Sequence, residues 1–111
     1  MDKSSLQAKA RELAHKASEA KSGRAADTVF GGHEKRMRQT VVALREGAEL
    51  AEHQSPGEAT LLVISGRLRL VSGDTSWAGR EWDHLIVPDA PHSVQAETDT
   101  TFLLTVAMSD R

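Results

Sequence analysis

The apolar residues of this chain follow a helical spacing up to about residue 26 and a strand-like spacing after it. The helical spacing is kept by five residues: Leu6, Ala10, Leu13, Ala14 and Ala17. This repeat predicts an amphipathic helix from Leu6 to Lys21 that begins after Ser4 or Ser5. Because the apolar stripe is narrow and rich in alanine, we expect the helix to lie outside a sheet or across a partner subunit.

From residue 28 onward, short apolar runs alternate with turn residues, which is typical of strands. The expected strands are 28–30, 37–44, a short strand ending at residue 53, 61–64, 68–71, one around Trp77, 85–87, 92–96 and 101–108. We expect 61–64 and 68–71 to pair as a hairpin. No helical pattern separates the strands, so the chain predicts an all-β sandwich or barrel after one helix. The expected organisation is a helical segment, 1–26, and a single β-barrel domain, 27–111.

Length and charge narrow the functional classes. At 111 residues, the chain is long enough for one core and too short for a second folded module. The 14 Lys and Arg residues are interspersed with 16 Asp and Glu residues, so no basic patch indicates a nucleic-acid partner. The chain has no cysteine, no apolar segment of signal-peptide length and no run long enough to span a membrane. We therefore expect a soluble, cytoplasmic protein that binds neither nucleic acid nor membranes.

The stretch from Gly47 to Gly66 contains a short strand ending at His53, a Pro-Gly turn and an apolar strand. This order predicts a hairpin-like corner with one histidine at its lip. The stretch resembles the first motif of the cupin superfamily, which reads Gly, five residues, His-x-His, three or four residues, Glu, six residues and Gly. Gly47, His53 and Gly66 fall on that pattern.

A second stretch, from Trp82 to Ala96, resembles the second cupin motif. That motif reads Gly, five residues, Pro-x-Gly, two residues, His, three residues and Asn. Pro88 matches, and His92 arrives one residue early, whereas Trp82 and Ala90 stand at the glycines and Ala96 at the asparagine. Together, the two stretches imply an all-β, RmlC-like cupin jelly-roll barrel with one N-terminal helix.

The resemblance also implies a metal centre inside the barrel. In the family, the two histidines of His-x-His, the glutamate and the second-motif histidine hold a divalent transition metal. This chain keeps His53 and His92 at ligand positions, whereas Ser55 stands at the second histidine and Ala59 at the glutamate. Two imidazoles alone hold a metal weakly, so we expect either a loosely bound Zn, Ni, Mn or Fe ion or none.

Two residues are candidates for a third metal ligand, His33 in a Gly-Gly turn and Glu58 beside the family's glutamate position. A pocket in the barrel is expected to be lined by four side chains: His53, Ser55, His92 and Gln39. These residue types can hydrogen-bond a small polar molecule whether or not a metal is present.

Strand periodicity leaves two placements open. On the strand 37–44, either Gln39 or the pair Arg38 and Thr40 faces the barrel interior, because successive side chains point to opposite faces. On the strand 85–87, His84 shares a face with Ile86, so both lie in the cavity or both lie outside it.

The resemblance favours a small cupin that binds a small molecule and acts as an accessory or sensor protein. The alternative is a metal-dependent enzyme, of dioxygenase, isomerase or decarboxylase type, that acts on a small organic acid. Cupin barrels commonly pair through a sheet edge or face, so we expect a homodimer.

Overall fold

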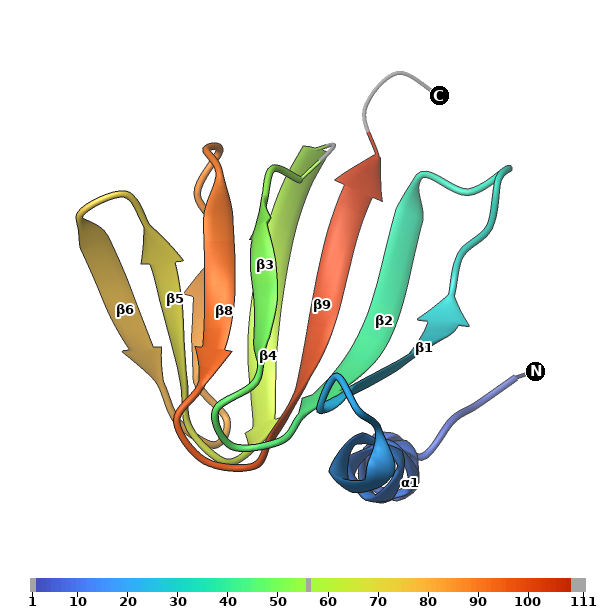
Figure 1. Ribbon diagram of the computed structural model, residues 1–111. Helices are drawn as coiled ribbons and strands as arrows, with labels where there is room; N and C mark the ends of the chain where they lie inside the picture. The colour runs from blue at the N-terminus through green and yellow to red at the C-terminus, as the bar shows by residue number, and fades with distance from the viewer. Residues whose placement is uncertain (1, 56, 109–111) are drawn as a thin grey trace.

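The computed structural model describes residues 2–55 and 57–108 as one helix followed by nine strands (Figure 1). The elements are α1 (Leu6–Glu19), β1 (Arg24–Phe30), β2 (Met37–Leu44), β3 (Glu49–His53), β4 (Gly57–Ser65), β5 (Leu68–Ser72), β6 (Thr75–Gly79), β7 (His84–Ile86), β8 (His92–Ala96) and β9 (Thr100–Met108). The predicted all-β architecture with one N-terminal helix is therefore confirmed.

The strands form two antiparallel sheets. Sheet A has the order β1-β2-β9-β4-β7, and sheet B has the order β3-β8-β5-β6. The inner faces of the two sheets pack against each other around Phe102, Leu61, Leu68 and Leu70, none of which is exposed. Each such side chain contributes about 1.5–3 kcal/mol when it is fully buried, so this shared core holds the two sheets together.

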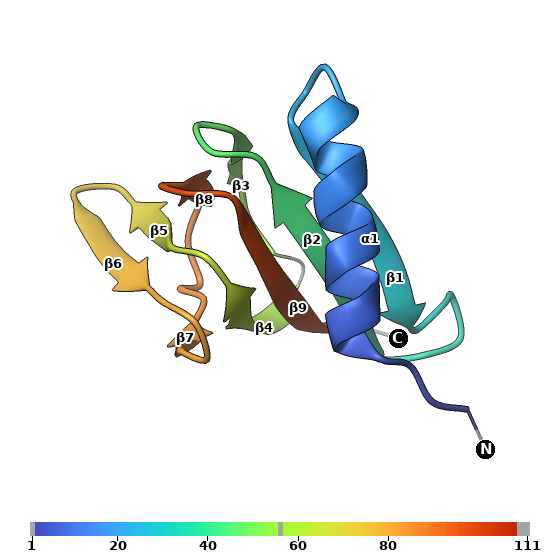
Figure 2. The ribbon, with the colours of Figure 1, turned by 90° about the horizontal axis from the view of Figure 1, so that it is seen from below.

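Helix α1 covers part of the outer face of sheet A, as its narrow apolar stripe predicts. Ala10, Leu13 and Ala17 pack on Val41 and Ala43 of that face. Figure 2 shows the helix lying along β1 and β2 and beside β9, while β4 and β7 extend beyond it. No helix in the described part of the chain is long and apolar enough to cross a membrane.

The ends of α1 are fixed by local contacts. The N-cap is Ser5, whose side chain accepts a hydrogen bond from the Ala8 amide. Lys9 Nζ lies 2.7 Å from Asp27 Oδ2, and this hydrogen bond holds the pKa of Asp27 below its ordinary value and that of Lys9 above it. Strand β1 begins at Arg24, inside the segment assigned to the helix from sequence, because it pairs with β2 as far as Leu44.

The predicted hairpin of 61–64 with 68–71 is wrong. Strand β4 pairs with β7 and β9, whereas β5 pairs with β6 and β8, so the link between β4 and β5 carries the chain from one sheet to the other. The corner before β4 is not a hairpin either, because β3 pairs with β8 in sheet B. Its Pro-Gly turn includes residue 56, which lies outside the described residues.

The crossing between sheets depends on Gly66. Its φ of +83° is a left-handed conformation, and a Cβ there would collide with the backbone of Asp99 and Thr100. Gly47, at the start of the first motif, has a similar φ of +87°, but no atom lies within 4 Å of the corresponding Cβ position. Both motif glycines are therefore required by backbone conformation, and only Gly66 is also required by close packing.

We predict that Gly66→Ala and Gly47→Ala differ sharply in stability. Gly66→Ala should lower the free energy of unfolding by about 3 kcal/mol or more, since strain and a backbone clash act together. Gly47→Ala should cost only about 1–2 kcal/mol, the penalty of the left-handed conformation alone. Urea denaturation of both variants measures the difference, and equal losses would contradict the packing argument.

Candidate functional site

Two histidines lie against each other where β3 ends and β8 begins. His53 and His92 are cross-strand partners in sheet B, and their ring centroids are 4.7 Å apart with an angle of 55° between the planes. His92 is 2% exposed, whereas His53 is exposed at the end of the strand. Figure 1 shows that the end of β3 and the start of β8 lie at the same, upper end of the two sheets, which we term the mouth.

A β-bulge in β3 brings His53 to the same face as His92. Leu50 is paired with Val94 and His53 with His92, so three steps along β3 correspond to two along β8. Leu50 packs against the inter-sheet core, so regular alternation would turn His53 away from it. The extra residue reverses this parity, and His53 faces inward beside its partner.

Each imidazole is held by a carbonyl two residues before it in the chain. His53 Nδ1 lies 2.9 Å from the oxygen of Ala51, and His92 Nδ1 lies 2.9 Å from the oxygen of Ala90. A carbonyl oxygen only accepts hydrogen bonds, so Nδ1 carries the proton in both rings. In the neutral form, each Nε2 then has a free lone pair, which is the state that binds a metal ion or accepts a hydrogen bond.

The loops that carry the two histidines are tied together. Gln54 Nε2 donates to Asp89 Oδ1 over 3.2 Å, and Ser72 Oγ donates to the carbonyl of Pro91 over 2.9 Å. Ser55, a predicted pocket residue, is half-buried in the loop that follows β3 at this end of the sheets. The structure therefore brings Ser55 to the mouth together with the histidine pair.

The structure does not bring Gln39 to the histidine pair. Gln39 is paired with Thr105 and donates to its hydroxyl over 3.1 Å, on the helix-facing side of sheet A that also carries Val41. Arg38 and Thr40 have the opposite parity and share the inward face with Val42. Of the two open alternatives, Arg38 and Thr40 therefore line the inner side of β2 near the mouth.

Comparisons with solved structures agree with this two-sheet architecture. A cupin superfamily protein from Desulfitobacterium hafniense matches with a TM-score of 0.73 and 18% identity, over 84% of this chain and 87% of its own. An RmlC-like cupin from Desulfovibrio desulfuricans matches with a TM-score of 0.67 and 26% identity, over 76% of this chain and 81% of its own.

The chain has the cupin fold. The cupin jelly-roll fold that the two sequence motifs implied is thus confirmed. A salicylate 1,2-dioxygenase variant from Pseudoaminobacter salicylatoxidans also matches, with a TM-score of 0.78 and 21% identity, over 94% of this chain and 35% of the dioxygenase chain. No protein-family model and no curated protein matches the sequence.

The strand register also shows where the family's ligand positions fall in this chain. Ala59 is 7% exposed and points into the inter-sheet core, so the family's glutamate position is an inward one that here carries a methyl group. Glu58 has the opposite parity and is exposed on the outer face of sheet A. His84 and Ile86 lie on that outer face too, because their partners are Leu62 and Thr60.

In the part of the chain that the structure describes, the two histidines have no third metal ligand beside them. Among residues 2–55 and 57–108, no group of three or more His, Cys, Asp or Glu side chains is arranged to hold a metal ion. His33 lies in the β1–β2 loop and Glu58 on the outer face, so the structure brings neither to the pair. These residues can hold a metal ion only through the two imidazoles. Water or a bound ligand would then have to fill the other coordination positions of the ion.

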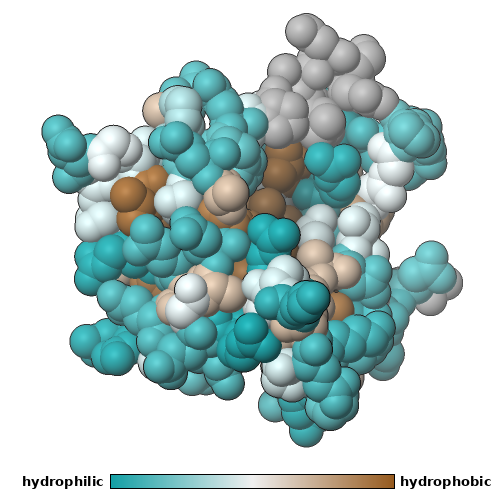
Figure 3. Space-filling view, viewed as in Figure 1, coloured by the Kyte–Doolittle hydropathy of each residue, from teal (hydrophilic) through white to brown (hydrophobic). Residues whose placement is uncertain are grey.

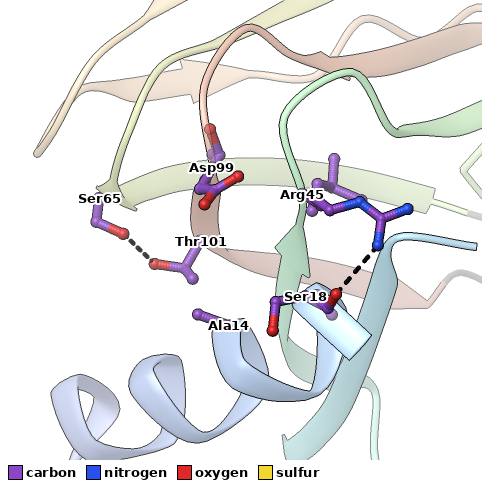
Figure 4. Close-up of a pocket in the computed structure, with 9 residues that line it drawn as sticks. Ala14, Ser18, Arg45, Ser65, Asp99 and Thr101 are labelled. Atoms are coloured by element: carbon purple, nitrogen blue, oxygen red, sulfur yellow. Dashed lines mark hydrogen bonds between the residues drawn. The ribbon is translucent and has the colours of Figure 1, made fainter. Parts of the chain in front are cut away.

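Three cavities lined by described residues lie away from the histidine pair. One, of about 480 Å³, lies at the edge between β6 and β7, near Trp77 and His84. A second, of about 410 Å³, and a third, of about 60 Å³, lie between α1 and sheet A. Figure 4 shows the smallest, with the hydrogen bond from Arg45 to the Ser18 carbonyl on one side and the Ser65–Thr101 hydroxyl pair on the other. It has room for only about two water molecules.

We predict that the two histidines differ in their effect on stability. His92→Ala should lower the free energy of unfolding by about 2 kcal/mol, because it removes a buried side chain from between the sheets. His53→Ala should cost about 0.5 kcal/mol or less, because that ring is exposed. Urea unfolding followed by circular dichroism tests this, and a loss for His53→Ala as large as that for His92→Ala would contradict the assigned burial.

Proposed function

We propose that this cupin binds a small organic anion at the mouth, through Arg38 and through a divalent metal ion held by His53 and His92. The observation that carries the proposal is the shared tautomer of the two imidazoles, which leaves both Nε2 lone pairs free to bind such a metal ion. Arg38 adds a positive charge on the inward face of the opposite sheet and has no ion-pair partner among the described residues. The side of the molecule seen in Figure 3 is mainly hydrophilic, with small apolar areas between hydrophilic ones.

We further propose that a divalent transition metal ion binds weakly to the two Nε2 atoms. When bound, such an ion supplies a Lewis acid that attracts oxygen donors of an anionic ligand. The chain's own residues hold the two rings in place through Ala51 and Ala90, so neither imidazole has to change tautomer. Weak binding at this site suits a binding or sensing role, because the occupancy of a weak site changes with the concentration of its ligand.

A binding role is better supported than metal-dependent catalysis. Metal sites that activate oxygen or water on protein scaffolds use three protein ligands, such as two histidines and one carboxylate. In this chain, the carboxylate position is Ala59, and the other histidine position is Ser55. The likeness to a salicylate dioxygenase, at 21% identity, extends to the fold and carries no ligand set with it.

We predict weak, histidine-dependent metal binding. Calorimetric titration of protein made without a metal-affinity tag, with Zn²⁺ and with Ni²⁺, should give a saturable signal that weakens about tenfold or more in His53→Ala. His84→Ala is the matched control, since His84 is an exposed histidine on the outer face of sheet A, and it should bind as the wild type does. Equal binding by all three proteins would remove the metal from the proposal.

A gain-of-ligand variant tests the same geometry in the other direction. Ser55→His combined with Ala59→Glu restores both changed family positions, and it should tighten Zn²⁺ binding by about 100-fold or more. Ser55→His combined with Glu58→Gln is the control, because Glu58 faces away from the core and its side chain cannot complete the site. No gain in the restored variant would show that His53 and His92 do not face a common metal position.

The anion contact has its own prediction. Salicylate serves as the probe, because it is a small aromatic acid and one structural neighbour is a salicylate dioxygenase. Arg38→Gln should weaken salicylate binding about tenfold, the loss expected for one hydrogen bond to a charged group. Arg67→Gln, at the opposite end of the sheets in the β4–β5 link, should leave it unchanged. Calorimetry at constant Zn²⁺ measures both, and an effect of Arg67→Gln equal to that of Arg38→Gln would contradict the assignment.

A further inference from the structure

A hollow lies on the outer face of sheet A, on the opposite side of that sheet from the histidine pair. It has a volume of about 410 Å³, within the range of small-molecule pockets. Helix α1 forms one wall, and β4 together with the turn before β7 forms the floor and the other wall. The described lining residues are Leu6, Gln7, Ala10, Arg11, Ala14, Leu62, Ile64, Ser65, Glu81, Trp82 and Thr101. We term this hollow the α1–β4 groove.

The groove exists because α1 covers only part of the sheet. The helix packs on β1, β2 and β9, so the outward side chains of β4 lie beyond its edge (Figure 2). Leu62 is half-buried and Ile64 is 8% exposed, and these two form an apolar floor. Ala10 and Ala14 are small, so the helix wall leaves space above that floor. The apolar interior favours a ligand with a hydrocarbon or aromatic body.

Trp82 forms the far wall in a conformation that is unfavourable for its residue type. Its φ is +70°, whereas the other described residues with positive φ are glycines, and 66% of the side chain is exposed. Two backbone hydrogen bonds fix this conformation. The Trp82 amide donates to the Val63 carbonyl over 2.8 Å, and the Val63 amide donates to the Asp83 carbonyl over 2.9 Å. A rigid turn therefore presents a large aromatic face beside the groove.

The rim of the groove carries two opposite charges. Arg11 projects from α1, and Glu81 precedes Trp82 in the turn. Neither side chain forms an ion pair or a side-chain hydrogen bond with any other described residue, in contrast to the neighbouring Lys9 and Glu12, which pair with each other. As far as the described residues go, Arg11 and Glu81 are thus a cation and an anion without ion-pair partners above an apolar floor.

We propose that the α1–β4 groove binds an α-amino acid with an apolar side chain, in its zwitterionic form. The ligand's carboxylate contacts Arg11, its ammonium contacts Glu81, and its side chain lies between Trp82 and the floor of Leu62 and Ile64. A ligand with a single charge is disfavoured, because an anion meets Glu81 and a cation meets Arg11. This site is independent of the proposed function at the mouth.

The experiment uses the full chain with Trp77→Phe, so that Trp82 is the only tryptophan. L-leucine should quench or shift Trp82 fluorescence with saturation below about 10 mM, the range of weak small-molecule sites. L-leucinamide, which lacks the carboxylate, and N-acetyl-L-leucine, which lacks the ammonium group, should each bind about tenfold more weakly, as expected when one charged hydrogen bond is lost. Calorimetry on the unmodified chain provides a readout that does not depend on the fluorophore.

Paired variants assign each contact. Arg11→Gln should remove the preference for L-leucine over L-leucinamide, and Glu81→Gln should remove the preference over N-acetyl-L-leucine. Arg24→Gln, which changes the same charge on β1 away from the groove, should keep both preferences. His53→Ala should also leave L-leucine binding unchanged, so failure at the mouth and failure in the groove can be told apart.

Trp82→Gly tests the aromatic wall without unfolding the turn, because glycine adopts a φ of +70° freely. By calorimetry, this variant should lose L-leucine binding while its melting temperature stays within a few degrees of the wild type. Three results would overturn the proposal: no saturation by L-leucine, equal affinity for the three probes, or a wild-type dimer in light scattering that Trp82→Gly converts to a monomer. The last would show that a second copy of the chain covers the groove.

Discussion

The alternation of side chains along β9 and β4 is the constraint from which the other placements follow. These strands lie in the middle of sheet A, with the inter-sheet core on one side and α1 beside the other. A shift of one position therefore moves a side chain from the core to the helix-facing side. Phe102 and Leu103 are neighbours in the chain and belong to different clusters for this reason.

The same alternation explains why the family's metal centre is incomplete here. Ala59 occupies the inward position of β4, and the carboxylate of Glu58 is exposed on the other face. A carboxylate one residue away in sequence is thus on the wrong side of a sheet, and no side-chain rotation corrects that. Glu58 therefore does not supply the missing glutamate ligand, although it lies next to the motif position in the sequence.

Much of the fold could be predicted from the sequence, because turn residues and apolar runs mark the strands. Strand partners could not, since the β4–β5 link has the length of a hairpin and instead joins two sheets. The orientation of β2 was also ambiguous, because Val41 faces the helix and Val42 faces the core, so the strand has no polar face. The histidine pair was predicted from the motif, but the bulge that aligns His53 with His92 has no local sequence signal.

Trp82 shows that backbone geometry can persist where the side chain departs from the pattern. The second cupin motif begins with glycine, and this chain has tryptophan there, yet the backbone is left-handed, as a glycine would permit. The left-handed backbone conformation costs a non-glycine residue such as tryptophan about 1–2 kcal/mol. The two backbone hydrogen bonds to Val63 extend the β4–β7 pairing and offset that cost, so the sheet imposes the turn on the residue. The turn thereby holds an aromatic ring, mostly exposed, beside an apolar groove, and this placement is the one that the proposed ligand site uses.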